Sequence, residues 1–211
     1  MKNKGILIVI SGFSGAGKGT LMNRLLELHP EEYALSVSAT TRAPRPGEEE
    51  GKAYFFKTRE AFEQMIREDA FIEYATYVKN YYGTPKAYVE EQLAAGKNVL
   101  LEIELQGAMK VKAKRPDTLL LFVTPPDADT LKERLVGRKT ETMDVIEARL
   151  ARAAQESQGM EQYDYLVVND DLDTCVEEMH QIIVSEHFRT FRNTQMIENI
   201  KNDVRRFSKG E

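Results

Sequence analysis

A glycine-rich loop near the start of the chain holds the residues best suited to chemistry. Residues 12–20 carry the spacing G-x-x-x-x-G-K directly after the apolar run at 6–10; in order they are Gly12, Phe13, Ser14, Gly15, Ala16, Gly17, Lys18, Gly19 and Thr20. Glycines let backbone N–H groups approach phosphate oxygens, and Lys18 adds a mobile charge for the terminal phosphates. The apolar run predicts a buried strand, and the residues after the loop have the apolar spacing of a helix. This order of elements favours a nucleotide-phosphate site over a turn that binds nothing.

The residue after Lys18 departs from the usual form of such a loop. A serine or threonine normally stands there and places its hydroxyl on Mg²⁺, but this chain has Gly19 and brings Thr20 one position later. A G-K-G-T ending resembles that of small nucleotide kinases, in which the threonine reaches a phosphate. We therefore expect a Mg²⁺ ion that is held largely by water and ATP oxygens, with Thr20 as a candidate ligand.

The composition limits the classes of protein to which the chain can belong. Its 211 residues, 42% hydrophobic and 30% charged, suit one globular core with modest insertions. No run approaches the ~20 apolar residues of a membrane span, and no signal peptide is expected. The net charge of −5 argues against general nucleic-acid binding. Because Cys175 is the only cysteine, the chain has no internal disulfide, and we expect a structural role for Cys175 and a cytoplasmic protein.

The pattern of apolar residues predicts an α/β core that is interrupted by an insertion. Short alternating runs, a proline-containing loop and a helix capped by Thr58 indicate a small, mostly β segment. Its expected strands are 35–38, 53–56 and 71–78, and a helix begins at Pro85 after it.

The parallel-sheet pattern then resumes and predicts a three-layer α/β fold. The expected strands are 98–103, 118–123 and 165–168, and the expected helices are 127–136 and 144–158. We divide the chain into a core of residues 1–35, 85–137 and 160–211, an insertion at 36–84, a lid with its return helix at 138–159, and a C-terminal helix at about 172–207.

Several longer signatures resemble those of the guanylate kinase family, which belongs to the P-loop nucleoside monophosphate kinases. They extend in the family's order from the first strand to about Glu186, and comprise residues 36–48, 80–84, Gln106-Gly107, Gly137-Arg138 and 168–171. The resemblance implies a P-loop kinase core with a parallel sheet, a GMP-binding insertion and a helical lid. It also implies Mg²⁺-dependent transfer of the ATP γ-phosphoryl group to GMP, and to dGMP, in purine nucleotide metabolism.

Arginines and tyrosines of the insertion are expected to bind the acceptor phosphate. Arg42 and Arg45 lie on one proline-stiffened loop and can hold a phosphate as bidentate forks. Tyr54 and Tyr82 can add phenolic donors. Two arginines on a loop can also form a solvated surface, but their place in the family signature favours the phosphate role.

The resemblance places Glu73 against the base of the acceptor, with Ser38 and Thr84 reaching the base through their hydroxyls. Guanine presents N1–H and N2–H donors on one edge, and a carboxylate can accept from both. Adenine would turn a lone pair toward Glu73, and such a mismatch can discriminate by ~10⁴ or more. Taken alone, Glu73 would simply be on the solvent face of an amphipathic strand.

Two glutamates interrupt the apolar run from Leu100 to Leu105. Glu102 and Glu104 are two residues apart on the expected strand, so both would project from one face. By resemblance, Glu102 would orient hydrated Mg²⁺ and Glu104 would contact the acceptor nucleoside. The family often has aspartate at both positions. The structural alternative for each is a carboxylate that is hydrogen-bonded to nearby backbone.

The expected lid brings positive charge to the transferring phosphoryl group. Arg134, Arg138 and Arg149 resemble the family's lid arginines and would neutralise the charge that develops there. Arg152 is expected in a surface ion pair, and Asn169 lies where the family holds the adenine of ATP. No general base is needed, because the nucleophile is a phosphate oxygen that is mostly ionised at neutral pH. The histidines are therefore expected to be non-catalytic: His29, His180 and His187.

The end of the chain predicts an amphipathic helix. Ile197, Ile200, Val204 and Phe207 are spaced three, four and three apart and form one stripe. A helix that leaves the domain would expose this stripe, so we expect a homodimer through it. The alternative is a tail that folds back on its own core.

Two other functions are compatible with this kind of fold. A peptide-binding scaffold module would typically have a degraded phosphate loop and neighbouring domains, whereas Lys18 and the lid arginines are intact here. A kinase for a sugar bisphosphate would not need a base-facing set such as Glu73, Ser38 and Thr84. We therefore expect ATP and GMP as the substrates, with no nucleic-acid or membrane partner.

Overall fold

The core of the protein is a parallel sheet, as the sequence predicts. The structure is a computed structural model that describes residues 4–77, 79–137 and 142–208. The strand order is β2-β7-β1-β8-β9, and every neighbouring pair is parallel. The strands are β1 (Leu7–Gly12), β2 (Tyr33–Leu35), β7 (Asn98–Glu102), β8 (Leu119–Thr124) and β9 (Tyr165–Val168).

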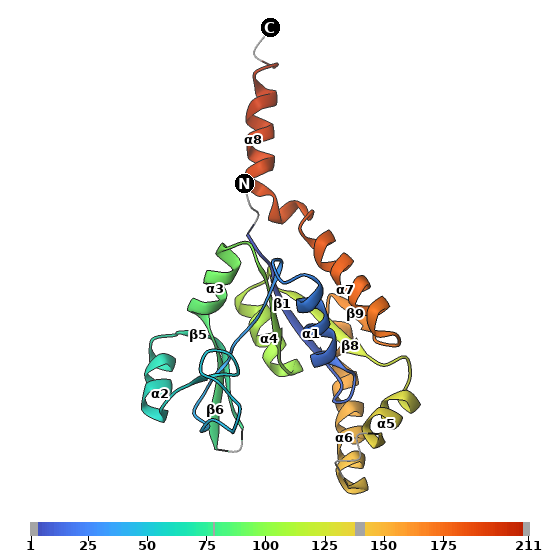
Figure 1. The fold of residues 1–211 in the computed structure, drawn as a ribbon. Helices are drawn as coiled ribbons and strands as arrows, with labels where there is room; N and C mark the ends of the chain where they lie inside the picture. The colour runs from blue at the N-terminus through green and yellow to red at the C-terminus, as the bar shows by residue number, and fades with distance from the viewer. Residues whose placement is uncertain (1–3, 78, 138–141, 209–211) are drawn as a thin grey trace.

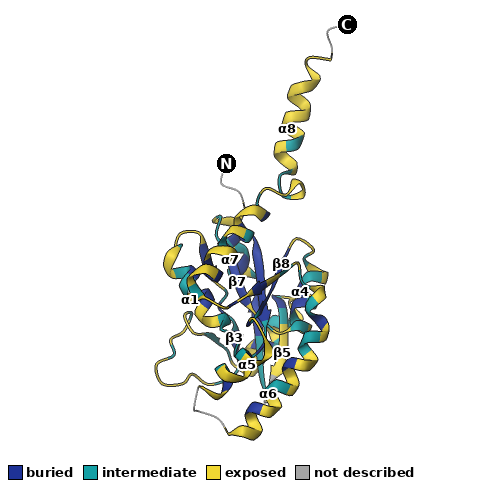
Figure 2. Ribbon diagram, turned by 90° about the vertical axis from the view of Figure 1, so that its right-hand side faces the viewer, coloured by how far each residue is buried: buried dark blue, intermediate teal, exposed yellow. Residues whose placement is uncertain are grey.

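Helices cover both faces of the core sheet (Figure 1), and alternate residues of the central strand β1 pack in two separate clusters. Ile8 and Ile10 pack with residues of α1 (Lys18–Leu28) and α7 (Leu172–Glu186), including buried Cys175. Leu7 and Val9 pack with residues of α3 (Lys86–Ala94) and α4 (Leu105–Lys114). Successive side chains of a strand point to opposite faces, so these two clusters establish a three-layer fold around a sheet that is buried on both sides (Figure 2).

The insertion has its own sheet, with strand order β4-β3-β6-β5. Its elements are β3 (Ala39–Thr40), β4 (Phe55–Phe56), α2 (Arg59–Arg67), β5 (Phe71–Tyr77) and β6 (Asn80–Pro85). Thr58 caps α2 as predicted, because its Oγ1 accepts from the Ala61 backbone N–H at 3.1 Å. Phe62 from α2 is stacked on both Phe71 and Tyr81, with ring centroids 4.4 and 5.2 Å away. This aromatic stack forms the small core of the insertion.

The strand expected at 35–38 is wrong, because the chain changes sheets there. Strand β2 ends at Leu35, and β3 begins at Ala39 in the other sheet. The Ser36 N–H still donates to the Leu100 carbonyl of the core sheet, whereas the Ser38 carbonyl accepts from Phe55 of the insertion. The residues between the two strands therefore connect core and insertion.

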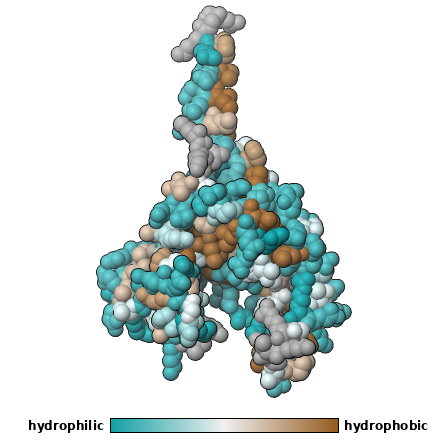
Figure 3. Space-filling view, in the orientation of Figure 1, coloured by the Kyte–Doolittle hydropathy of each residue, from teal (hydrophilic) through white to brown (hydrophobic). Residues whose placement is uncertain are grey.

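Two helices follow β8, on the other side of the molecule from the insertion (Figure 1). They are α5 (Ala128–Val136) and α6 (Met143–Glu156), and a 3₁₀ turn at Ser157–Gln162 (η1) follows them. Helix α5 ends in the expected core segment, whereas α6 lies in the expected lid at 138–159, of which residues 138–141, including Arg138, lie outside the described residues. In the space-filling view a deep notch separates this region from the insertion (Figure 3).

The helix expected over about 172–207 is divided in two. After α7, a 3₁₀ turn at Thr190–Arg192 (η2) leads into α8 (Thr194–Arg205). The break has a local cause: the side-chain amide of Asn193 donates to the carbonyls of His187 and Arg189, which satisfies the end of the first helix. Helix α8 then leaves the body of the molecule and is exposed along almost its whole length (Figure 2). Among the residues that the structure describes, every helix is too short or too polar to cross a membrane.

Candidate active site

The glycine-rich loop joins β1 to α1, in the strand–loop–helix order that the sequence predicts. Gly17 has φ 89°, and a Cβ at this position would lie 2.4 Å from the Asn169 side-chain nitrogen. That nitrogen donates to the Ala16 carbonyl at 2.7 Å, and Asn169 is buried. Asn169, just after β9, therefore holds the backbone of the loop in place. The sequence does not reveal this role, because the contact joins residues 153 positions apart. A glycine at position 17 is required for this close approach.

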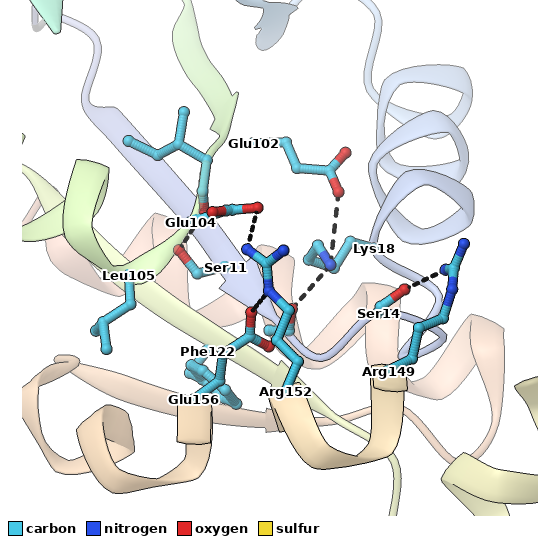
Figure 4. Close-up of a pocket in the computed structure, with 12 residues that line it drawn as sticks. Ser11, Ser14, Lys18, Glu102, Glu104, Leu105, Phe122, Arg149, Arg152 and Glu156 are labelled. Atoms are coloured by element: carbon cyan, nitrogen blue, oxygen red, sulfur yellow. Dashed lines mark hydrogen bonds and ion pairs between the residues drawn. The ribbon is translucent and has the colours of Figure 1, made fainter. Parts of the chain in front are cut away.

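Lys18 is folded over the loop that carries it. Its Nζ donates to the carbonyls of Gly12 and Phe13 at 2.9 and 3.2 Å, and lies 3.6 Å from Glu102 Oε1 (Figure 4). Glu102 and Thr20 line one hollow of about 250 Å³ above the loop; the other residues that line it are Ser14, Gly15, Gly17, Lys18 and Gly19. The Lys18 ammonium and the Glu102 carboxylate thus lie beside one hollow, which is otherwise lined by residues of the glycine-rich loop and by Thr20.

The expected placement of Glu104 on a strand is wrong. Strand β7 ends at Glu102, and Glu104 is the N-terminal cap residue of α4, because the chain turns into a helix directly after the strand. The two glutamates nevertheless lie at the same end of the sheet and line the same pockets. Glu104 is 73% exposed and pairs with Arg152 of α6 at 2.6 Å, and Arg152 also donates to Glu156 at 3.0 Å (Figure 4).

A second pocket, of about 370 Å³, lies between the insertion and the core. The predicted acceptor residues that line it are Ser38, Tyr54, Glu73, Tyr82 and Glu104, and the structure adds Gln106 and Lys110. Thr84 is fully buried and donates from its hydroxyl to Glu73 Oε1 at 2.8 Å, so it orients the carboxylate. Burial raises the pKa of Glu73, and the hydrogen bond from Thr84 opposes the shift.

The two arginines of the acceptor loop are organised by a residue that sequence reasoning did not single out. Arg42 donates to both oxygens of Glu48 at 2.8 and 2.9 Å, and the Arg45 N–H donates to Glu48 at 2.7 Å. The Arg42 hydrogen bond holds the pKa of Glu48 below its usual value. The Arg42 guanidinium also lies 5.3 Å from the ring centre of Tyr54, at the edge of the acceptor pocket. Both bonds from Arg42 to Glu48 come from Nη2, and Nη1 donates to the Ala43 carbonyl at 2.7 Å, so a carboxylate occupies one arm of the guanidinium that the sequence assigns to phosphate.

Of the expected lid arginines that the structure describes, Arg149 contacts the glycine-rich loop and Arg134 lies elsewhere. Arg149 donates to the Ser14 hydroxyl at 2.6 Å, and with Arg152 and Lys18 it lines a pocket of about 520 Å³ (Figure 4). Arg134 instead lies near Asp170, with 3.5 Å between its Nη2 and the Asp170 carbonyl oxygen. Arg138 lies outside the described residues. Arg152, expected only in a surface pair, thus sits inside the site.

The phosphate-loop pocket and the acceptor pocket meet at one wall. Glu102, Ile103 and Glu104 line both of them. One pocket brings together a phosphate loop, Lys18 and Arg149; the other brings together the partly buried carboxylate of Glu73 and aromatic hydroxyls. This geometry suits the transfer of a group between two bound anions.

Comparison with solved structures agrees with this fold and site. The crystal structure of guanylate kinase from Anaplasma phagocytophilum superimposes with a TM-score of 0.69 at 34% identity, covering 91% of both chains. Fold and site together define a nucleoside monophosphate kinase, a phosphotransferase built on a parallel α/β core.

Sequence comparison identifies the family. The family model described as guanylate kinase matches residues 4–186. The guanylate kinase of Streptococcus thermophilus (strain CNRZ 1066) is 49% identical over 205 residues, which cover 97% of this chain and 98% of the relative. The guanylate kinase of Lactococcus lactis subsp. lactis (strain IL1403) is 48% identical over 205 residues, 97% of this chain and 100% of that one. The chain belongs to the guanylate kinase family.

Proposed function

We propose that the protein transfers the γ-phosphoryl group of Mg²⁺-bound ATP to GMP, and to dGMP, in cytoplasmic purine nucleotide metabolism. The observation that carries this proposal is the shared wall at 102–104, which joins a phosphate-loop pocket to a pocket with a guanine-compatible carboxylate. The products would be ADP and GDP. We expect neither a nucleic acid nor a membrane as a partner.

On the donor side, the loop N–H groups and Lys18 would bind the β- and γ-phosphates of ATP. Lys18 already lies against the loop, so its charge is positioned before ATP arrives. Arg149, held on Ser14, would contact the phosphates from the lid side, with Arg134 and Arg138 joining on closure. Asn169 would lie beneath the adenine-proximal part of the nucleotide while it supports the loop. These groups stabilise charge where it develops.

On the acceptor side, Glu73 would accept hydrogen bonds from the guanine N1–H and N2–H. The Thr84 hydroxyl donates to one oxygen of Glu73 at 2.8 Å and so helps to orient the carboxylate. Arg42, Arg45, Tyr54 and Tyr82 would bind the phosphate, once Arg42 exchanges Glu48 for the ligand. Ser38 would reach the base, and Glu104 would contact the nucleoside.

The oxygen donors near the loop fit a magnesium ion that arrives with ATP. Glu102 and Thr20 line the same hollow, and Mg²⁺ prefers oxygen ligands and retains several waters. Glu102 would hold the hydrated ion, and Thr20 would supply a hydroxyl. When bound, the ion would neutralise charge on the phosphates.

Steady-state kinetics with GMP, AMP and ribose phosphates as acceptors test the proposal. A large preference for GMP supports it. Turnover of a sugar phosphate without turnover of GMP would point to a related sugar kinase, and tight peptide binding without turnover would point to a scaffold module.

The open notch further suggests that catalysis requires closure. The insertion and the lid region would move together over both nucleotides and exclude water, which would otherwise accept the phosphoryl group. Small-angle scattering with a bisubstrate analogue should show a smaller radius of gyration than the free protein. An unchanged radius would contradict this step.

We also propose that α8 mediates a homodimer. Its apolar residues form one stripe on the exposed helix (Figure 3), with Ile200 and Val204 exposed by 53 and 57%, and Phe207, in the turn after the helix, is exposed by 75%. The spacing of three, four and three residues from Ile197 to Phe207 matches the seam of a two-helix coiled coil, which makes a second α8 a suitable partner. The helix lies beyond residue 186, where the family match ends.

Sedimentation tests the dimer directly. A chain that ends at Arg192 keeps the core and the insertion but lacks α8. It should sediment as a monomer, whereas the intact chain should sediment as a dimer. Identical association states of the two chains would overturn the proposal.

A further inference from the structure

Far from the phosphate loop, two of the three histidines in the chain meet a glutamate. His29 ends α1, Glu32 lies in the turn before β2, and His180 lies in the middle of α7. One nitrogen from each imidazole and one carboxylate oxygen all lie within 4.8 Å of one another. The His29 Nδ1 is already 3.2 Å from Glu32 Oε1, and the two rings are stacked with 3.9 Å between centroids. We propose that these three side chains form a site for a divalent transition-metal ion, with Zn²⁺ as the best fit.

The donor set selects the kind of ion. Two imidazoles and one carboxylate are typical ligands of zinc sites that keep a fourth position for water. Imidazole nitrogen favours Zn²⁺ and its neighbours over Mg²⁺ and Ca²⁺, which prefer oxygen. The site is therefore distinct in chemistry from the magnesium position proposed at the phosphate loop.

A buried tyrosine supports one of the ligands from behind. The Tyr33 hydroxyl lies 2.8 Å from His180 Nδ1, and Tyr33 is 1% exposed. In the tautomer that donates from Nδ1 to the tyrosine oxygen, Nε2 keeps its lone pair for a metal. Metal-bound histidines almost always have such a partner on their second nitrogen, which fixes the ring.

The other two ligands have room to adjust. Ligand atoms at about 2.1 Å from a tetrahedral ion lie about 3.4 Å apart, so the widest of the present spacings must close by up to about 1.4 Å. Parallel rings cannot both aim a lone pair at one point, so His29 must turn out of the stack. Its side chain is 24% exposed and that of Glu32 is 52% exposed, so both can rotate and the ion can enter from solvent.

The position of the site gives the ion a structural consequence. Helices α1 and α7 pack side by side, and an ion would join the end of one to the middle of the other. The unpaired carbonyls at the C-terminal end of α1 also favour a cation there. Lys18 begins the same helix, about 16 Å away at 1.5 Å per residue. The ion would therefore stabilise the element that carries the phosphate loop without touching the substrates.

Calorimetric titration of the untagged, nucleotide-free protein with Zn²⁺ tests the site. We expect one Zn²⁺ per chain, and a rise in Tm of about 5–10 °C at a concentration a hundredfold above Kd. Glu32→Gln and His29→Gln should each weaken binding by more than about tenfold, the loss that follows removal of even a supporting residue. Both positions are partly exposed, so these variants should fold, whereas His180→Gln would also lose the Tyr33 bond.

Glu31→Gln is the matched control, because Glu31 is an exposed neighbouring carboxylate outside the cluster. It should bind Zn²⁺ like the unaltered protein. Kinase activity without Zn²⁺ should be the same in all of these variants, which separates failure of this site from failure of the proposed reaction. An absence of Zn²⁺ binding, or binding that Glu32→Gln and His29→Gln leave unchanged, would overturn the proposal.

Discussion

The two halves of the active site are built on very different foundations. The phosphate loop lies on a parallel sheet that is covered by helices on both faces and has two extensive buried clusters. The acceptor pocket lies on a small sheet whose cluster has Ala39, Phe62 and Phe71 as its buried members. Burial per residue grows with the size of a folded unit, so the insertion has little stability to spare. The donor half is thus preorganised by the fold, whereas the acceptor half depends on a few aromatic contacts.

The largest effect should come from removing the centre of the insertion. Phe62→Ala deletes a fully buried ring that is stacked on both Phe71 and Tyr81, and such deletions cost about 3–5 kcal/mol. The insertion should loosen before the core does, so GMP binding should fall far more than ATP binding in calorimetric titration. Leu25→Ala in the core is the control, since it should lower Tm and affect both ligands together. Equal losses of GMP and ATP binding by Phe62→Ala would show that the halves are not independent.

On the donor side, Lys18→Ala should leave the fold intact and lower kcat by roughly 10²–10³. The ammonium contacts loop carbonyls and faces the pocket, so its loss removes charge stabilisation rather than packing. Steady-state kinetics at saturating GMP measure the loss, and circular dichroism checks the fold. Lys97→Ala, at the opposite end of the core, should keep normal activity. A folded Lys18→Ala variant with near-normal kcat would contradict the phosphate-loop assignment.

Glu73→Gln should weaken the selection of the base by one to two decades in kcat/KM for GMP. The change turns one acceptor into a donor that opposes the guanine N–H groups, and a lost bond to a charged group costs roughly 1.5–3 kcal/mol. AMP should lose less or improve, because its N1 can accept from the new amide. ATP binding without acceptor should hardly change. Equal losses for GMP and AMP would show that Glu73 supports the fold instead.

The raised pKa of Glu73 makes the preference for GMP depend on pH. As pH falls through this raised pKa, the carboxylate becomes protonated at a higher pH than the ordinary value of 4.5, and it loses one acceptor position. The ratio of kcat/KM for GMP to that for AMP should therefore decline, up to tenfold per pH unit below the pKa. Using the ratio cancels the titration of the acceptor phosphate, which both substrates share. Glu73→Gln should show a flat ratio, and a parallel decline in that variant would refute the assignment.

The raised pKa of Glu73 should also make stability depend on pH, but in the opposite direction to the preference for GMP. A carboxyl whose pKa is raised by folding binds more protons in the native state, so stability falls as pH rises from 4.5 through the raised pKa. Denaturant unfolding should find Glu73→Gln more stable than the unaltered protein at neutral pH, and the difference should shrink as the pH approaches 4.5.

The smallest effect should come from Arg152→Ala. The pair with Glu104 joins α6 to α4 across the site, but both side chains are largely exposed, and such pairs contribute about 0–1 kcal/mol. Releasing Glu104 should lower KM for GMP by at most about fivefold and leave kcat nearly unchanged. Arg24→Ala, which removes an exposed pair with Asp173, is the matched control. A large fall in kcat would instead place Arg152 among the groups that contact the phosphates.

Local sequence predicts the donor half well because its pattern is continuous along the chain. Strand, glycine loop, Lys18 and helix follow one another, and each type of residue has one geometric use there. The parallel sheet was predictable for the same reason, from apolar runs of strand length. The capping of α2 by Thr58 is equally local.

The features that sequence reasoning missed depend on contacts between distant segments or on changes of direction. Asn169 reaches the loop from the end of the last strand, and Arg152 of α6 enters the site through its pair with Glu104, which precedes α4. The chain leaves the core sheet after Leu35, where its alternating pattern continues unbroken. The end of α7 is set by an amide that folds back from Asn193. A periodic pattern records which face is apolar but not where the backbone changes course.

The pairing of Arg42 with Glu48 means that the acceptor site already contains an imitation of its ligand. In the absence of a nucleotide, both oxygens of the Glu48 carboxylate accept from one guanidinium nitrogen of Arg42. An incoming anion must compete with this resident carboxylate, which carries a single charge. A terminal phosphate approaches two charges at neutral pH, whereas a phosphodiester carries one. If Arg42 binds the acceptor phosphate as proposed, free monophosphates should displace Glu48 more readily than a phosphate linked within a nucleic-acid chain.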